Sequence, residues 1–81
     1  EYASVMAAMG DYKAAESHAR MAVTADPESA RAYHVLGTAL DAQGFHPQAE
    51  VAFRKSLELW PQDEDPTAIL NNLGLNLASQ G

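Results

Sequence analysis

Hydrophobic residues recur along this chain at the spacing of one face of an α-helix, with polar residues between them. In the middle of the sequence, residues at spacings of three, four and seven form one mostly apolar stripe, made of Tyr33, Leu36, Gly37 and Leu40. A second stripe follows in the next segment, made of Ala49, Phe53 and Ser56. These two stripes predict a pair of helices that pack face to face, with Gly37 at a close crossing where a side chain has no room.

Caps and helix breakers divide the chain into five predicted helices, over about residues 2–9, 12–25, 30–43, 47–59 and 66–80. Asp11, Ser29 and Asp65 are placed as N-caps, and Pro66 suits the first helical position. Gly10, Gly44 and Gly81 are placed where helices end, as C-terminal caps or stops. The connections are short, which favours antiparallel neighbours. The expected fold is therefore all-α.

An internal repeat of 34 residues relates the first part of the chain to the second. The residues Gly10, Ala15, Glu16, Arg20 and Pro27 recur as Gly44, Ala49, Glu50, Arg54 and Pro61. Such a period is typical of a solenoid built from stacked helix pairs. Solenoids of this kind present an extended surface that binds other proteins. The pairs Glu16/Arg20 and Glu50/Arg54 have i,i+4 spacing and are expected to support outward helix faces.

The repeating unit resembles the tetratricopeptide repeat family. The middle unit carries the family's pattern at Tyr33, Leu36-Gly37, Leu40, Gly44, Ala49, Phe53 and Pro61. The preceding unit matches through Gly10, Tyr12, Ala15, Ala19, Ala22 and Pro27, and Leu70, Leu73-Gly74, Leu77 and Gly81 open a third unit. The resemblance implies a right-handed superhelix of antiparallel helix pairs, with a partial first repeat over 1–28, a complete repeat over 29–62 and the first helix of a third over 63–81. The chain is thus expected to be a piece of a longer array.

A polar stripe on the third predicted helix is the main candidate site. It consists of Arg31, His34, Thr38 and Asp41, at spacings that place them on one helix face. In the family, the matching positions line a concave groove that holds a peptide or protein segment, and the related places elsewhere are Ser4, Asn71, Asn72 and Leu75. The alternative is an ordinary solvated face. In chaperone-binding members an asparagine at the place of Asn72 helps to clamp a terminal carboxylate, but Val35 at the related place in the second unit argues against such a clamp here.

Charge narrows the range of partners. The chain carries 11 acidic and 5 basic side chains, for a net charge of −6. This balance argues against binding to nucleic acid or to an anionic membrane surface, and it favours a basic or apolar peptide. No apolar run approaches the ~20 residues of a membrane-spanning helix, so membrane insertion is not expected.

Some residues could suggest a metal site or a catalytic site, but each has a simpler explanation. The run Asp63-Glu64-Asp65 is too short for a calcium loop and suits a turn with a helix cap. His46 and Glu50 have a metal-compatible spacing but no further ligands in sequence, and no catalytic motif is present. We therefore expect no cofactor, no metal and no enzymatic activity. Trp60 suits either an exposed binding position or a buried place at the repeat junction.

The sequence of residues 69–75 and 78–81 is similar to bacterial tetratricopeptide proteins that assist assembly of tight-adherence (Flp-type) pili. This similarity implies a periplasmic scaffold associated with the outer membrane, whereas without it the compartment could equally be the cytoplasm. Two other functions stay open. The chain could be a purely structural or oligomerisation module, or it could be an accessory domain of a larger enzyme.

The fifth predicted helix carries an apolar face that no later segment of the sequence covers. Its residues are Ile69, Leu70, Leu73 and Leu77. Leaving such a face in water forfeits about 25 cal/mol per Å² of apolar surface. We therefore expect self-association through this last helix.

Overall fold

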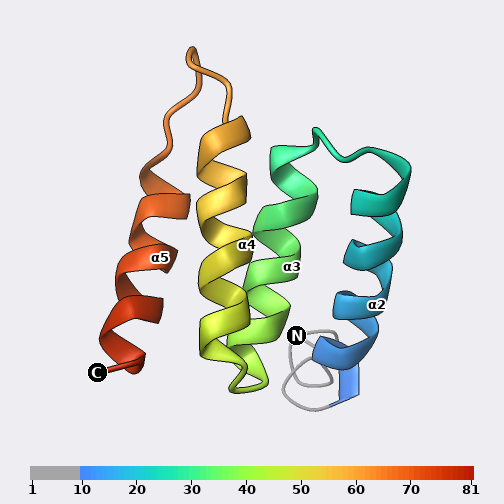
Figure 1. Cartoon of the computed structure of the whole chain (residues 1–81), viewed down its shortest axis with the longest axis vertical. Helices are drawn as coiled ribbons and strands as arrows, with labels where there is room; N and C mark the ends of the chain where they lie inside the picture. The colour runs from blue at the N-terminus through green and yellow to red at the C-terminus, as the bar shows by residue number, and fades with distance from the viewer. Residues whose placement is uncertain (1–9) are drawn as a thin grey trace, which may run out of the picture.

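The computed structural model describes residues 10–81, and over this range the chain forms four helices and no strand (Figure 1). They are α2 (Gly10–Ala25), α3 (Ala30–Ala42), α4 (His46–Leu59) and α5 (Thr67–Ser79). The all-α prediction is confirmed. The predicted helix over residues 2–9, and with it Ser4, lies outside the described residues.

The helices lie side by side in chain order, and each runs antiparallel to the one before it (Figure 1). α3 packs between α2 and α4, while α5 packs mainly on α4 and also touches α3. Short connections force this order because they give consecutive helices no room to separate. The predicted antiparallel pairs are confirmed.

Local signals account for most of the helix boundaries. The Ser29 hydroxyl accepts a hydrogen bond from the Ala32 backbone N–H at 3.1 Å, as predicted for an N-cap. Gly44 follows α3 with φ of 92°, a left-handed conformation that favours glycine. Two predicted boundaries are wrong. α2 already includes Gly10 and Asp11, so Asp11 is not its N-cap.

The start of α5 is the second boundary that differs from the prediction. Pro66 is the N-cap and not the first helical residue, and its carbonyl accepts the Leu70 N–H at 3.0 Å. The Asp65 carboxylate accepts the Thr67 N–H at 3.0 Å and also the Thr67 hydroxyl. Asp65, one residue before the N-cap, therefore provides an acceptor for the backbone N–H of the first helical residue. These hydrogen bonds lower the pKa of its carboxyl.

The core is a single cluster that runs through all four helices. Its buried members are Ala19, Leu36, Leu40, Ala49, Ala52, Phe53, Ile69 and Leu73. The two stripes predicted for the middle unit meet at the α3–α4 interface, although Tyr33 at the edge is only half-buried. The buried Ser56 hydroxyl donates to the Ala30 carbonyl at 2.8 Å, which satisfies the only polar side chain on these stripes apart from Tyr33.

The apolar residues of α5 do not form the single uncovered face that the sequence predicts. Ile69 and Leu73 are buried within the core, whereas Leu70 and Leu77 remain 48% and 40% exposed. The reason is helical geometry, since residues 69, 73 and 76 form one stripe and residues 70 and 77 lie about a quarter-turn away. Of the four residues predicted to form this face, Leu70 and Leu77 are therefore the ones that remain uncovered.

A repeated hydrogen-bonded triad joins neighbouring helices. The Glu16 carboxylate accepts from Arg20 Nε at 2.8 Å and from Gln43 Nε2 at 2.8 Å, so it ties α2 to the end of α3. The same arrangement joins α4 to α5, with Glu50, Arg54 and Gln80. The predicted i,i+4 pairs are present, and each also receives a glutamine from the next helix pair.

Candidate protein-binding surface

Exposed side chains of α3 and α5 form the surface where the sequence places the groove. Helical spacing puts Arg31, Val35 and Thr38 on one side of α3, and all three are exposed. Asn71 and Leu75 are exposed on α5. We call these five residues the α3–α5 face. Contacts made by His34 and Asp41 hold its two halves together.

His34 joins the two helices through its ring. Its Nε2 accepts a hydrogen bond from the Asn72 amide at 2.7 Å. The ring is half-buried, with its centroid 6.1 Å from those of both Phe53 and Trp60. Burial lowers the pKa of His34, and the positive charge of Arg31 lowers it further. A neutral imidazole is therefore favoured, and only this form leaves Nε2 free to accept from Asn72.

Asp41 belongs to a second connection between α3 and α5. Its Oδ1 accepts from the amide nitrogen of Asn76 at 2.9 Å and also contacts Nδ1 of His46. The same Asn76 amide donates to the His46 carbonyl at 2.9 Å, and its oxygen accepts from Gln80 at 3.0 Å. Asn76 is fully buried, so these bonds supply the partners that burial demands.

The structure therefore divides the predicted site residues into two groups. Arg31, Thr38, Asn71 and Leu75 are exposed. His34, Asp41 and Asn72 are half-buried and use their polar atoms to join α3 to α5. The second group holds the surface in shape, and the first group is free to contact a partner. Ser4 lies outside the described residues.

Two residues important for this surface were not predicted as part of it. Val35 is 50% exposed and places an apolar side chain between Arg31 and Thr38. Asn76 holds the support underneath. Position 76 follows Leu73 by three residues and Ile69 by seven, so the helical period alone places it on the buried stripe. The polar residue type concealed that signal.

Charge on the α3–α5 face comes from Arg31. Its guanidinium lies 3.6 Å from the Glu64 carboxylate, and its side chain is 80% exposed. An exposed pair at this distance contributes little to stability, so the guanidinium can exchange Glu64 for a ligand group. The Thr38 hydroxyl donates to the His34 carbonyl at 3.0 Å, which leaves its oxygen as an acceptor.

Trp60 lies at the repeat junction. It is half-buried, packs against the core cluster and meets the His34 ring edge to face. Its indole Nε1 is buried without a hydrogen-bond partner among residues 10–81. Of the two roles open from the sequence, the structure supports packing at the junction.

Within the described part of the chain, no cluster of three His, Asp or Glu side chains is arranged to hold a metal ion. No helix in residues 10–81 combines the length and the apolar character needed to cross a membrane.

Comparison with known proteins identifies the repeat. Residues 1–39 match one sequence profile described as a tetratricopeptide repeat, and residues 29–60 match a second profile of the same description. The two matches together span residues 1–60. No curated protein and no solved structure matches the chain with significance. The matched profiles and the antiparallel helix pairs agree, and the chain belongs to the tetratricopeptide repeat family.

Proposed function

We propose that this chain is a scaffold that binds a peptide or protein segment on the α3–α5 face. The family implies protein–protein interaction, and the location rests on one observation. Val35 and Leu75 are 50% and 59% exposed, and polar Arg31, Thr38 and Asn71 accompany them on the same face. Apolar anchors within a polar rim are the usual composition of a protein-binding surface.

The face is held by contacts that do not involve its exposed residues. His34 with Asn72, and Asp41 with Asn76, join α3 to α5. A pre-ordered surface loses less entropy on binding than a flexible one. Changes to the exposed residues should therefore weaken binding without unfolding the protein, whereas a change to Asp41 would alter both.

A selection experiment tests this proposal. Peptides selected from a phage-displayed random library on the immobilised chain are synthesised, and their affinities are measured by calorimetry. Val35→Glu combined with Leu75→Glu should weaken binding by about ten-fold or more, because both anchors are lost. Met21→Glu is the matched control, since Met21 is exposed on α2 outside the face. Unchanged affinity for the double variant, or an equal loss in the control, would refute the location.

A finer proposal concerns the biological setting. We infer from residues 69–75 and 78–81 a role in assembly of tight-adherence pili, in the periplasm at the outer membrane. Its support is the sequence of that segment. Deletion of the gene should remove pili from the cell surface in electron micrographs, and the protein should fractionate with the cell envelope. Normal piliation after deletion would exclude this role and leave the general scaffold function, a purely structural role or an accessory domain of an enzyme.

A further inference from the structure

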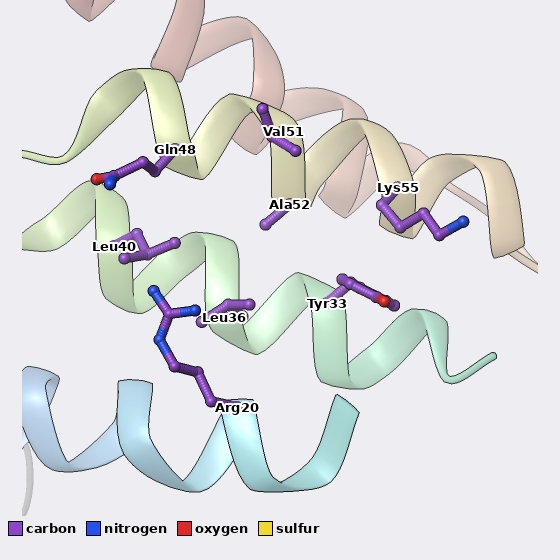
Figure 2. A pocket seen from close by; sticks show the side chains of 8 residues that line it. All are labelled: Arg20, Tyr33, Leu36, Leu40, Gln48, Val51, Ala52 and Lys55. Atoms are coloured by element: carbon purple, nitrogen blue, oxygen red, sulfur yellow. The ribbon is translucent and has the colours of Figure 1, made fainter. Parts of the chain in front are cut away.

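A cavity of about 490 Å³ lies on the side of α3 opposite to the α3–α5 face, between α2 and α4 (Figure 2). Its floor is formed by Tyr33, Leu36 and Leu40. Helical spacing places these three residues on the other side of α3 from Arg31 and Thr38. The volume is within the range of pockets that bind small ligands or single side chains.

The walls of the cavity combine apolar surface with positive charge. α4 contributes Val51, Ala52 and Lys55, with Gln48 at one end, and α2 contributes Arg20. Val51 is 69% exposed, so an apolar side chain stands uncovered at the rim. Among residues 10–81, both charged residues that line the cavity are basic and no acidic residue lines it, although the whole chain has 11 acidic and only 5 basic side chains.

We propose that this cavity binds an acidic peptide segment that inserts one bulky apolar side chain over the floor. The segment's carboxylates would pair with Arg20 of α2 and Lys55 of α4, which line the cavity from different helices (Figure 2). Charge complementarity selects this partner, because both charged side chains that line the cavity among residues 10–81 are basic, although Glu16 and Glu58 each pair with one of them and the whole chain has a net charge of −6. The site is separate from the α3–α5 face and does not depend on it.

The Arg20 side chain is oriented so that its guanidinium can bind a carboxylate in the cavity. Its Nε donates to Glu16 at 2.8 Å, and Figure 2 shows its guanidinium directed from α2 toward Leu36 and Leu40. Within residues 10–81, Nε is the atom through which this guanidinium is bonded, so its two terminal nitrogens are available to a carboxylate. A planar guanidinium binds a carboxylate through two parallel hydrogen bonds.

Lys55 can exchange its present partner. Its Nζ lies 3.5 Å from the Glu58 carboxylate, and both side chains are substantially exposed. Such a pair contributes little, so a ligand carboxylate can replace Glu58 at small cost. Tyr33 is half-buried at the same end of the floor (Figure 2), where its ring can pack against an inserted side chain.

Three blocked synthetic peptides test the chemistry of the ligand. The probe is Asp-Glu-Leu-Phe-Asp-Glu, and its controls are Asn-Gln-Leu-Phe-Asn-Gln, without charge, and Asp-Glu-Ala-Ala-Asp-Glu, without apolar bulk. Fluorescence anisotropy should give the probe an affinity about ten-fold higher than either control. Amide chemical-shift changes should be largest at Arg20, Leu36 and Leu40 and at residues 48–55. Absence of binding, or shifts confined to the α3–α5 face, would overturn the proposal.

Matched charge variants test the site itself. Arg20→Gln with Lys55→Gln removes both cavity cations, and Lys13→Gln with Arg54→Gln removes two cations that do not line the cavity. The net charge changes equally in the two double variants, and thermal melts confirm that both are folded. The first should weaken probe binding about ten-fold and the second less than about two-fold. Equal weakening would mean that binding is diffuse electrostatics, and no weakening in the first would exclude the cavity.

Discussion

Gly37 allows α3 to pack closely against the Phe53 ring of α4. A Cβ at this position would lie 2.7 Å from Cδ1 and Cε1 of the Phe53 ring. Phe53 is only 1% exposed within the core, so its ring has little room to move. At Gly74 of α5, which follows Gly37 by 37 residues, a Cβ would meet no atom of the described residues within 4 Å outside the adjacent helix backbone. The two glycines occupy related positions, but a side chain at Gly37 would collide with a ring and one at Gly74 would meet open space.

Alanine substitution should separate these two glycines. Gly37→Ala should lower the free energy of unfolding by about 1–3 kcal/mol, because the core becomes overpacked. Gly74→Ala should raise it by roughly 0.5–1 kcal/mol, because alanine favours the helix and meets open space. Urea denaturation monitored by circular dichroism measures both. Effects of the same sign would show that the α3–α4 contact has been placed wrongly.

Titration of His34 should make the free energy of unfolding depend on pH between about pH 7 and about pH 5. Burial and Arg31 lower its pKa in the folded state below the ordinary value of 6.5. As the pH falls from about 7 to about 5, the unfolded chain takes up a proton that folded His34 resists, so stability decreases. Protonation also removes the acceptor for Asn72.

The variant His34→Gln tests this pH effect because glutamine can still accept from Asn72 but does not titrate. Thermal melts between about pH 7 and pH 5 should show a smaller loss of stability in the variant than in the natural chain. The carboxyls of Glu16, Glu50 and Asp65 have lowered pKa values and act at more acidic pH, so they do not confuse this window. An identical pH dependence in the two proteins would contradict the prediction.

At the scale of helices, the repeated Glu–Arg–Gln triads explain how one helix pair stays in register with the next. Gln43 bonds lower the pKa of Glu16, and Arg20 adds to this effect. Arg54, followed by Gln80, does the same for Glu50. Both glutamates lie 34 residues apart, as the repeat requires, whereas the two glutamines lie 37 apart. The insertion before α5 thus leaves the contact intact.

Removal of Gln43 should weaken the contact between α2 and α3 without affecting the one between α4 and α5. Gln43→Ala should lower the free energy of unfolding by about 0.5–1.5 kcal/mol, the usual net contribution of a hydrogen bond. It should also raise the pKa of Glu16 toward its ordinary value, which a carbon-detected NMR titration measures. Gln62→Ala, at an exposed position in the α4–α5 connection, is the control and should change neither quantity. An unaltered Glu16 pKa in the Gln43 variant would show that this contact is absent in solution.

The helical period predicts which residues of a helix are buried only where apolar and polar residue types separate onto different faces. The stripes of Leu36, Gly37 and Phe53 were predicted correctly because their residue types agree with the helical period. Ile69 and Leu70 are both apolar and adjacent, so only the position of α4 decides that Ile69 is the buried one. The role of Asn76 depends on partners 30 and 35 residues away, which no local pattern indicates. Arg31, Thr38, Asn71 and Leu75 of the α3–α5 face were predicted as groove positions, but neither Val35 nor the support that Asn76 provides was predicted.

At the scale of the whole molecule, the second stripe of α5 presents a surface like one that is already used within the fold. Gly74 and Leu77 follow Gly37 and Leu40 by 37 residues, and Gly37 and Leu40 lie at the interface with α4. Among residues 10–81, no helix packs against the stripe of Leu70, Gly74 and Leu77. The stripe therefore has the shape of a helix-packing surface, and a second copy of the chain can supply a helix to cover it.

We expect the chain to self-associate through this stripe at micromolar concentration. Sedimentation equilibrium should show dimers or larger species, because burial of Leu70 and Leu77 recovers about 25 cal/mol per Å² of apolar surface. Leu77→Glu should shift the population toward monomer, since a carboxylate cannot enter an apolar interface without a partner. Leu75→Glu is the matched control, on the same helix but on the α3–α5 face. Leu73→Glu would not serve, because Leu73 is buried and its loss would unfold the protein. A folded monomer throughout the micromolar range, or equal dissociation by the Leu75 variant, would show that this stripe is not the contact between copies.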